Sequence, residues 1–367
     1  MAEIFTGHWA ATTLLAQAAP LAAPEPTLWH WLVFSAFVVI LLTLDLVVFH
    51  RHAREPTLRE SAIWTVVWCS IALAFNGLIW AWRGNERGIE FLTGYLVEWS
   101  LSMDNVFVFA VIFGFFGVPL KYQYRVLFWG ILGAIIMRLA FILLGTALLE
   151  QFDWVLWIFG VFLIYTGVKL ALHDSSEVNP EKNLLMRAAK RLFHIAKENH
   201  GDRFFAIENG KRCITPLFLV LLVVESTDVL FAVDSVPAIF GITNDPFIVF
   251  TSNIFAILGL RALYFLLAGV MDLFRYLNYG LSAVLVFVGG KMVFEFWTGH
   301  HLVTPTWSLV IILSLLGVSI VASIIAQKRE TPRAEKPPEP DRDKIAPIAV
   351  EAMGTPGAEK SPDADRS

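Results

Sequence analysis

Charged residues are scarce in this chain, and cysteines are almost absent. Only 16% of the 367 residues are Asp, Glu, Lys or Arg, and the formal net charge is −4, so bulk charge gives no reason to expect nucleic-acid binding. Cys69 and Cys213 stand far apart and support neither a disulfide framework nor a thiolate metal cluster. The sequence also lacks a nucleotide-binding P-loop, which argues against an ATP-driven process.

Apolar and aromatic residues are abundant instead. Hydrophobic residues make up 56% of the chain, including 13 Trp and 30 Phe, as in proteins that span a lipid bilayer with aromatic side chains near both interfaces. A bilayer core needs about 20 mostly apolar residues per helix. The stretches that meet this need lie near 29–49, 61–82, 90–116, 123–148, 153–172, 213–234, 247–270, 279–297 and 306–327.

The connecting segments predict the orientation of these spans. Segments 51–60 and 173–212 are basic, whereas 149–153 and 242–245 are acidic, so basic links fall on alternate sides, as the positive-inside rule requires. This places the N-terminus outside and the C-terminus in the cytoplasm. The main cytoplasmic loop would be 173–212, with an amphipathic helix around 183–198 that lies on the membrane surface.

The two ends of the chain differ from the apolar middle. The leader 1–28 resembles a signal peptide only weakly, because Glu3 is its only early charge, and whether it is cleaved stays open. The tail 328–367, rich in Pro, Glu, Lys, Ala and Asp, is typical of a disordered segment. The transmembrane domain is therefore predicted over 29–327.

Two parts of this domain resemble each other. GAIIMRLAFILLGTALLEQF (133–152) is similar to FAILGLRALYFLLAGVMDLF (255–274), which aligns Arg138 with Arg261, and TGVKL aligns with VGGKM, which pairs Lys169 with Lys291. Each repeat, 90–172 and 213–297, holds three spans. Because three is an odd number of spans, the second repeat must enter the membrane from the opposite side. Such an inverted repeat is common in secondary transporters. Chance similarity between apolar segments is the alternative.

Carboxylates within the predicted spans are the most informative residues. An ionised carboxylate deep in lipid costs at least several kcal/mol, so these groups must face a cation, each other or a water-filled cavity. The acids align between the repeats in one of two registers, Asp104 with Asp228, or Glu98 with Asp228 and Asp104 with Asp234. The acids in question are Glu98 and Asp104 in the third span, Glu225, Asp228 and Asp234 in the sixth, and Asp45 in the first.

Spacing within the sixth span predicts an interrupted helix. Glu225 and Asp228 share a helix face, but acids six residues apart point about 120° away from each other in a regular helix. Asp228 and Asp234 would reach one site only if the helix were broken, and Pro237 favours a break because it cannot donate to the Val233 carbonyl.

Oxygen ligands of this kind suit hard divalent cations such as Mg²⁺, Ca²⁺ or Mn²⁺. Met103 would add a softer ligand that favours Mn²⁺, or it merely packs against its neighbours. The alternative for the acids is ion pairing with Arg138 and Arg261, although the acids outnumber these arginines. The predicted metal site comprises Glu98, Asp104, Asn105, Glu225, Asp228, Asp234, Ser235 and Met103, and further transport-path candidates are Asp45, Asn76, Arg138, Asn253 and Arg261.

Three stretches, EWSLSMDNVFVFAVIF, VVESTDVLFAVDSVPAIFGIT and TSNIFAILGLRALYFLL, resemble the signature regions of the TerC/Alx family of bacterial membrane proteins. The resemblance runs from about residue 30 to 327. It implies a manganese exporter of the bacterial inner (cytoplasmic) membrane, in a family named for an association with tellurite resistance. The family's acidic motif positions correspond here to Glu98, Asp104, Asn105, Glu225, Asp228, Asp234 and Ser235.

The sequence therefore predicts an all-α membrane protein with about nine transmembrane helices and an inverted three-plus-three repeat core. Its expected function is secondary transport that exports Mn²⁺ or a similar divalent cation, with protons released from clustered acids as the metal enters. No tightly bound cofactor and no enzymatic activity are expected, and a homo-oligomer stays open. The alternative is a membrane component of a tellurite or stress-resistance system that does not itself transport.

Overall fold

The computed structural model describes residues 24–50, 57–152, 154–172, 184–196, 201, 203–208, 210–267, 276–299 and 303–330. One compact unit reaches to Ile324, and a second begins at Ile325, of which the end of the last helix is described. The predicted leader up to residue 23 and the predicted tail from residue 331 lie outside the described residues, as do His300 and His301.

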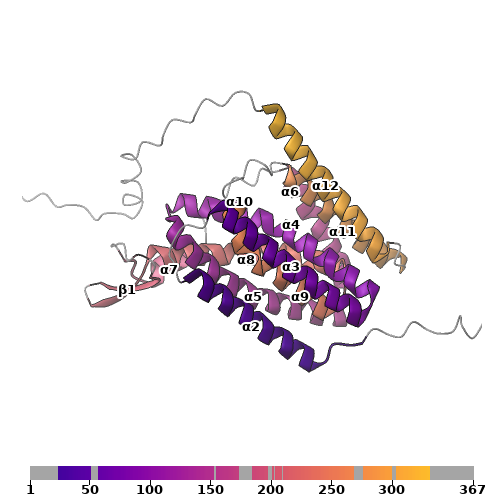
Figure 1. The fold of residues 1–367 in the computed structure, drawn as a ribbon, viewed down its shortest axis with the longest axis horizontal. Helices are drawn as coiled ribbons and strands as arrows, with labels where there is room; N and C mark the ends of the chain where they lie inside the picture. The colour runs from indigo at the N-terminus through magenta and orange to yellow at the C-terminus, as the bar shows by residue number, and fades with distance from the viewer. Residues whose placement is uncertain are drawn as a thin grey trace, which may run out of the picture. The chain divides into compact units, whose positions relative to one another are not determined.

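Long apolar helices make up most of the described chain (Figure 1). Eight of those described are long and apolar enough to cross a membrane, and a bent pair, α9 with α10, makes a ninth. The helices are α2 Leu28–His50, α3 Leu58–Arg83, α4 Asn85–Phe115, α5 Leu120–Gln151, α6 Trp154–Leu172, α7 Leu184–Leu192, α8 Pro216–Phe240, α9 Pro246–Leu258, α10 Leu260–Leu267, α11 Leu277–Thr298 and α12 Pro305–Glu330.

Every span predicted from hydropathy overlaps one of these helices or the bent pair, so the all-α membrane fold is confirmed. Local signals set the ends of several helices. Thr57 caps α3 in a capping box with Glu60, and Asp245 caps α9 through its side chain. The predicted seventh span is divided at Gly259, where α9 and α10 meet at a bend of 40°.

The break predicted in the sixth span is wrong. Helix α8 continues through Pro237 to Phe240. The proline lies in the last turn of α8. It removes the hydrogen bond to the Val233 carbonyl, but no further turn of helix follows that its ring could bend away. Asp228 and Asp234 consequently sit on one regular helix and point in different directions.

The predicted cytoplasmic loop is more structured than expected. Its amphipathic helix is shorter than the predicted 183–198, because α7 covers Leu184–Leu192 and 197–200 lie outside the described residues. An antiparallel hairpin follows, made of β1 Phe205–Glu208 and β2 Lys211–Ile214. The sequence analysis missed this hairpin, because strands of four residues give only a weak alternating pattern.

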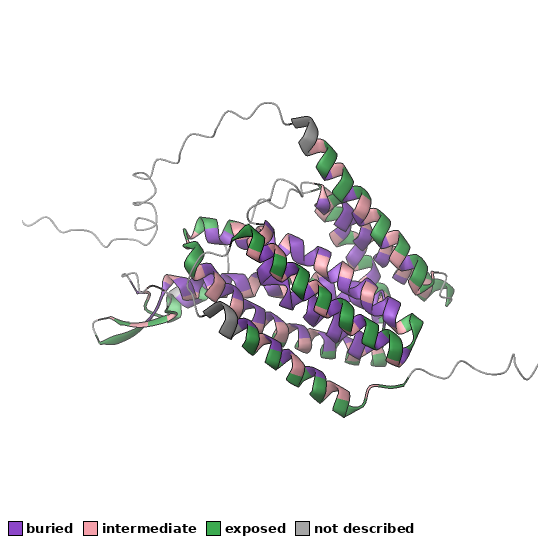
Figure 2. Ribbon diagram, in the orientation of Figure 1, coloured by how far each residue is buried: buried purple, intermediate pink, exposed green. Residues whose placement is uncertain are grey.

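The helices pack in pairs that mix the two predicted repeats. Helix α4 packs on α9, α5 on α8, and α6 on α11. Buried residues lie between the packed helices (Figure 2); the bent pair α9–α10 is buried almost throughout, and α4 has the largest buried share of the eight described single-helix spans. At the α6–α11 contact, Gly160 meets the backbone of Gly289, and Gly167 meets the backbone of Ser282. The alignment that pairs Lys169 with Lys291 also pairs Gly160 with Ser282 and Gly167 with Gly289, so it maps each of these two contacts onto the other. The inverted repeat stays a prediction, with which this packing agrees.

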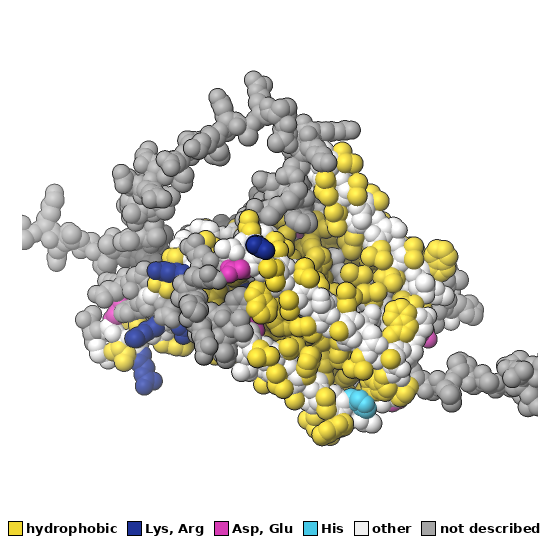
Figure 3. Space-filling model, in the orientation of Figure 1, with side chains coloured by type: hydrophobic (Ala, Val, Ile, Leu, Met, Phe, Trp, Pro, Cys, Tyr) yellow, Lys and Arg dark blue, Asp and Glu magenta, His cyan; other side chains and the backbone are white. Residues whose placement is uncertain are grey.

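The outer surface of the bundle is apolar. Figure 3 shows hydrophobic side chains over most of the visible face, with Lys and Arg gathered near the hairpin end. Six exposed tryptophans stand where helices meet the predicted extracytoplasmic side, as in an interfacial aromatic belt, whereas the exposed Trp129 of α5 lies away from it. The six are Trp29 of α2, Trp80 of α3, Trp154 and Trp157 of α6, Trp297 of α11 and Trp307 of α12. A multi-pass membrane protein is the fold that these features require.

Candidate functional site

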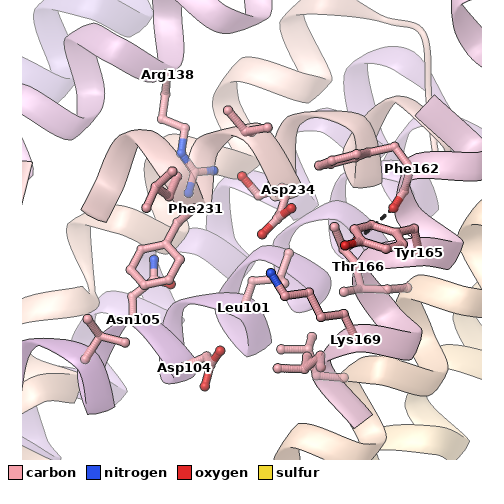
Figure 4. A pocket seen from close by; sticks show the side chains of 17 residues that line it. Leu101, Asp104, Asn105, Arg138, Phe162, Tyr165, Thr166, Lys169, Phe231 and Asp234 are labelled. Carbon is pink, nitrogen blue, oxygen red and sulfur yellow. Dashed lines mark hydrogen bonds between the residues drawn. The ribbon is translucent and has the colours of Figure 1, made fainter. Parts of the chain in front are cut away.

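A cavity of about 530 Å³ opens among five helices, α4, α5, α6, α8 and α11. Its walls are mainly apolar, and a small set of polar side chains interrupts them (Figure 4). These polar lining residues are Asp104 and Asn105 of α4, Arg138 of α5, Tyr165, Thr166 and Lys169 of α6, and Asp234 and Ser235 of α8. An apolar cavity with a few convergent polar groups is the usual form of a binding site.

Asp104 and Asp234 face this common space from two different helices. Their carboxylates lie close enough for one charge to act on the other. In the described part of the chain, the Asp104 Oδ1 and the Ser235 Oγ are buried without a hydrogen-bond partner. Other buried atoms of the described chain, such as Thr146 Oγ1 and Ser308 Oγ, also lack a partner, but Asp104 and Ser235 line the cavity, so their oxygens could accept a ligand there.

The backbone of α8 lacks one helical hydrogen bond near the cavity. Pro237 has no N–H, so the carbonyl of Val233, which lines the cavity, receives no helical hydrogen bond from that position. The fold therefore agrees with the missing hydrogen bond that Pro237 predicts, although it does not contain the predicted helix break.

Arg138 lies beside the cavity and neutralises Glu98. Its guanidinium forms an ion pair with the Glu98 carboxylate, which is 1% exposed, and donates a hydrogen bond to the Asn253 side chain. Asp228 also interacts electrostatically with Arg138. The structure does not bring Glu98, a predicted metal ligand, to the cavity wall, and it gives Glu98 a basic partner of its own.

Asp45 also has a basic partner of its own, Arg261. Its carboxylate forms an ion pair with Arg261 that ties α2 to α10, and both side chains are almost fully buried. Neither residue is part of the cavity wall. For Asp45 and Glu98, the alternative of structural ion pairing therefore holds, whereas Asp104 and Asp234 have no such arginine in the described contacts.

Glu225 and Asp228 form a second acidic pair on α8, away from the cavity wall. They lie three residues apart on one helix face and interact with each other, as the spacing predicts. Glu225 packs its carboxylate onto Gly133 of α5, where a larger residue would collide with it. The structure thus does not bring these two acids to the Asp104–Asp234 site.

The remaining candidates divide between the cavity and the core. Asn105 lines the cavity, whereas Asn76 is buried in α3 outside it, and Asn253 serves as the partner of Arg138. Met103 is buried in the apolar core that α4 shares with α5 and α8. This placement corresponds to the packing alternative for Met103 and not to a sulfur ligand at the site.

Sequence reasoning missed one group at the site, Lys169. The side chain reaches from α6 into the space near Asp234 and acts on it electrostatically (Figure 4). The repeat alignment contains Lys169, but a lysine near the end of a span is usually an interfacial residue, and the pattern gave no reason to prefer the cavity.

The ligand set of the site is modest. Among the described residues, no three of the His, Cys, Asp and Glu side chains converge as a group that could hold a metal ion. Two carboxylates, Asp104 and Asp234, stand with the neutral oxygens of Asn105 and Ser235. A site with two charges and neutral oxygens binds a divalent cation more weakly than a site with more carboxylates, since affinity follows the ligand charge count.

A second cavity of about 500 Å³ lies at the other ends of α4, α8 and α11. Its charged groups are mostly paired, Arg87 with Glu90 and Lys291 with Glu295. One apolar cluster contributes to the walls of both cavities: Leu101, Leu281 and Leu285 line the first, whereas Ile242 and Met292 line the second.

Comparisons with known proteins agree with this architecture. The chain is 51% identical over 306 residues to "Uncharacterized membrane protein STKORF319" of Myxococcus xanthus, covering 83% of this chain and 94% of the relative. It is 47% identical over 277 residues to the "Putative membrane-bound redox modulator Alx" of Escherichia coli (strain K12), covering 73% and 86%. A protein with the same printed name from Photorhabdus laumondii is 44% identical over 316 residues, covering 83% and 96%.

No solved structure matches the chain. The model of the integral membrane protein TerC family matches residues 83–331, which include every residue of the cavity wall. The chain therefore belongs to the TerC family of integral membrane proteins.

Proposed function

We propose that the protein is a secondary transporter that exports Mn²⁺, or a similar hard divalent cation, from the cytoplasm across the inner membrane. One observation carries the proposal: Asp104 and Asp234 share a cavity within the membrane-spanning bundle, and neither forms an ion pair with an arginine in the described contacts. Unbalanced negative charge at this depth is costly unless a cation or protons compensate it.

The chemistry of the lining groups supports a hard cation. Carboxylate, amide and hydroxyl oxygens from Asp104, Asp234, Asn105 and Ser235 are the ligands that Mg²⁺, Ca²⁺ and Mn²⁺ prefer. The Asp104 and Ser235 oxygens that lack a hydrogen-bond partner would be two of these ligands. A set with few charges also suits a transporter, because an ion must be released as well as bound.

The arrangement of the two cavities supports alternating access. In the orientation that the basic loops favour, the Asp104–Asp234 cavity lies on the cytoplasmic side, and the second cavity lies on the outer side. The apolar cluster that contributes to both walls separates them. An ion taken up from the cytoplasm would leave through the second cavity once these apolar contacts rearrange.

Proton exchange is the proposed driving reaction. Asp104 and Asp234 repel each other when both are ionised without a metal, which favours a bound proton in the empty site. Entry of a divalent cation removes that preference and releases the proton. The metal ion and the proton would thus cross the membrane in opposite directions.

The decisive experiment is ion flux in liposomes that contain the purified protein. We expect Mn²⁺ flux that depends on a pH gradient and falls at least about tenfold in Asp104→Asn and in Asp234→Asn. Glu150→Gln, at an exposed carboxylate near the end of α5, is the matched control and should transport normally. Flux that both cavity substitutions leave intact would reject this site.

The alternative is a membrane component that does not transport. The relatives' printed name describes a redox modulator, and the two cysteines are the thiols of this chain; both are free in the described residues. Cys69 lies in α3, where Tyr95 donates a hydrogen bond to it, and Cys213 is buried in β2. Absence of flux in well-folded protein, together with a normal Mn²⁺ content in cells that lack it, would favour this alternative.

A further inference from the structure

Lys169 stands three residues before the end of α6 and lines the cavity that contains Asp104 and Asp234. Its charge acts on Asp234, yet the described contacts include no direct ion pair or hydrogen bond of its ammonium group. The residue is exposed, so its long side chain has room to move between the cavity and its surroundings. Figure 4 shows the ammonium group directed toward the Asp234 carboxylate.

The repeat-related lysine is held in place, by contrast. Lys291 donates a hydrogen bond to the Gly241 carbonyl at 3.3 Å and lies 3.8 Å from the Glu295 carboxylate. It lines the second cavity, where its charge is compensated locally. Of these two aligned lysines, only Lys169 stands at a carboxylate site with an unmatched charge.

The charges at the site decide what a mobile ammonium group does there. Arg138 is compensated by Glu98, so the two aspartates, when both are ionised, and Lys169 carry one net negative charge, which the proton of the empty site neutralises. A divalent cation that entered beside the ammonium group would create a net positive charge in apolar surroundings. A cation that entered while Lys169 turned away would neutralise the two carboxylates.

We propose that Lys169 is a tethered competitor of the transported cation. Its ammonium group occupies the neighbourhood of Asp234 while the site is empty and leaves it when a divalent cation binds. The inference rests on the proposed function, and it assigns Lys169 the role of lowering affinity and speeding release. The lysine also keeps the charge of the empty site low, which eases the return of the unloaded carrier through apolar surroundings.

The test compares Mn²⁺ binding to purified wild-type protein, Lys169→Gln and Lys169→Arg by titration calorimetry. We expect Lys169→Gln to lower the Kd about tenfold, equivalent to about 1.4 kcal/mol, and Lys169→Arg to stay near the wild type because its charge remains. In liposomes, Lys169→Gln should lower both the KM and the maximal rate, since a tightly bound ion leaves slowly.

Lys291→Gln is the matched control, because it removes the aligned charge from the other cavity and should leave the Kd unchanged. A Kd of Lys169→Gln equal to or higher than that of the wild type would overturn the inference, even while Asp104→Asn abolishes binding and so upholds the metal site. A wild-type protein that binds no Mn²⁺ would overturn both the inference and the proposed function.

Discussion

The carboxylates of Asp104 in α4 and Asp234 in α8 line one cavity and act on each other across it, although they lie in different predicted repeats. The second register of the repeat alignment pairs these same two residues with each other. It also pairs Glu98 with Asp228, and both of those acids interact with Arg138. One pair thus faces an open cavity, and the other pair shares a single arginine.

The two cavity aspartates should act as one unit in binding. We expect Asp104→Asn and Asp234→Asn each to weaken Mn²⁺ binding at least about tenfold, and the double variant to lose less than the sum of the two effects, because ligands of one ion are coupled. Titration calorimetry of the single variants and the double variant checks this. Strictly additive losses would show that the two residues do not share an ion.

Mn²⁺ affinity should fall as the pH falls. A proton and a metal ion compete for the same carboxylate oxygens, so protonation of Asp104 or Asp234 removes a ligand charge and raises the Kd. We expect about one to two protons to be released per ion bound, measured by calorimetry in buffers of different ionisation enthalpy. An affinity independent of pH would contradict metal/proton exchange at this site.

Removal of Arg138 should destabilise the protein strongly. Arg138→Gln leaves the buried Glu98 carboxylate without its partner, which costs about 3–5 kcal/mol. The melting temperature in detergent should drop accordingly. The double variant Arg138→Gln with Glu98→Gln should recover part of the loss, because Glu98 no longer carries an unpaired charge, whereas Asp228 still lacks its positive neighbour. Equal stability of the single and double variants would show that the pair contributes nothing.

The variant Asp45→Asn tests whether Asp45 has a structural role or binds the metal ion. It breaks the buried ion pair with Arg261 that joins α2 to α10, so the melting temperature should fall. The Mn²⁺ Kd should stay at the wild-type value, because Asp45 is absent from the cavity wall. A large change in Kd at unchanged stability would return Asp45 to the transport path.

Close packing of α6 on α11 depends on two glycines that face each other. A Cβ at Gly289 would collide with the backbone of Gly160, which cannot move aside as a flexible side chain can. Gly289→Ala should therefore destabilise the protein by about 1–3 kcal/mol. The neighbouring Gly290→Ala is the control, because open space surrounds its Cβ position, and thermal melting should distinguish the two.

Most of the fold could be predicted from the sequence, because the length and hydropathy of a span are local properties. Each predicted span proved to be a helix or the bent pair, with ends shifted by a few residues where caps such as Thr57 and Asp245 act. Pro237 was overinterpreted, since the effect of a proline depends on its distance from the helix end. The hairpin of the predicted cytoplasmic loop was missed because its strands are too short to give a pattern.

By itself, the sequence determined that the chain spans a membrane many times and carries more intramembrane carboxylates than arginines, because both follow from composition and spacing. Only the tertiary structure decided which carboxylates those arginines neutralise and which face an open cavity beside Lys169. The reason is that the charge state and ligand role of a buried group depend on neighbours from distant helices, whose approach no local pattern records.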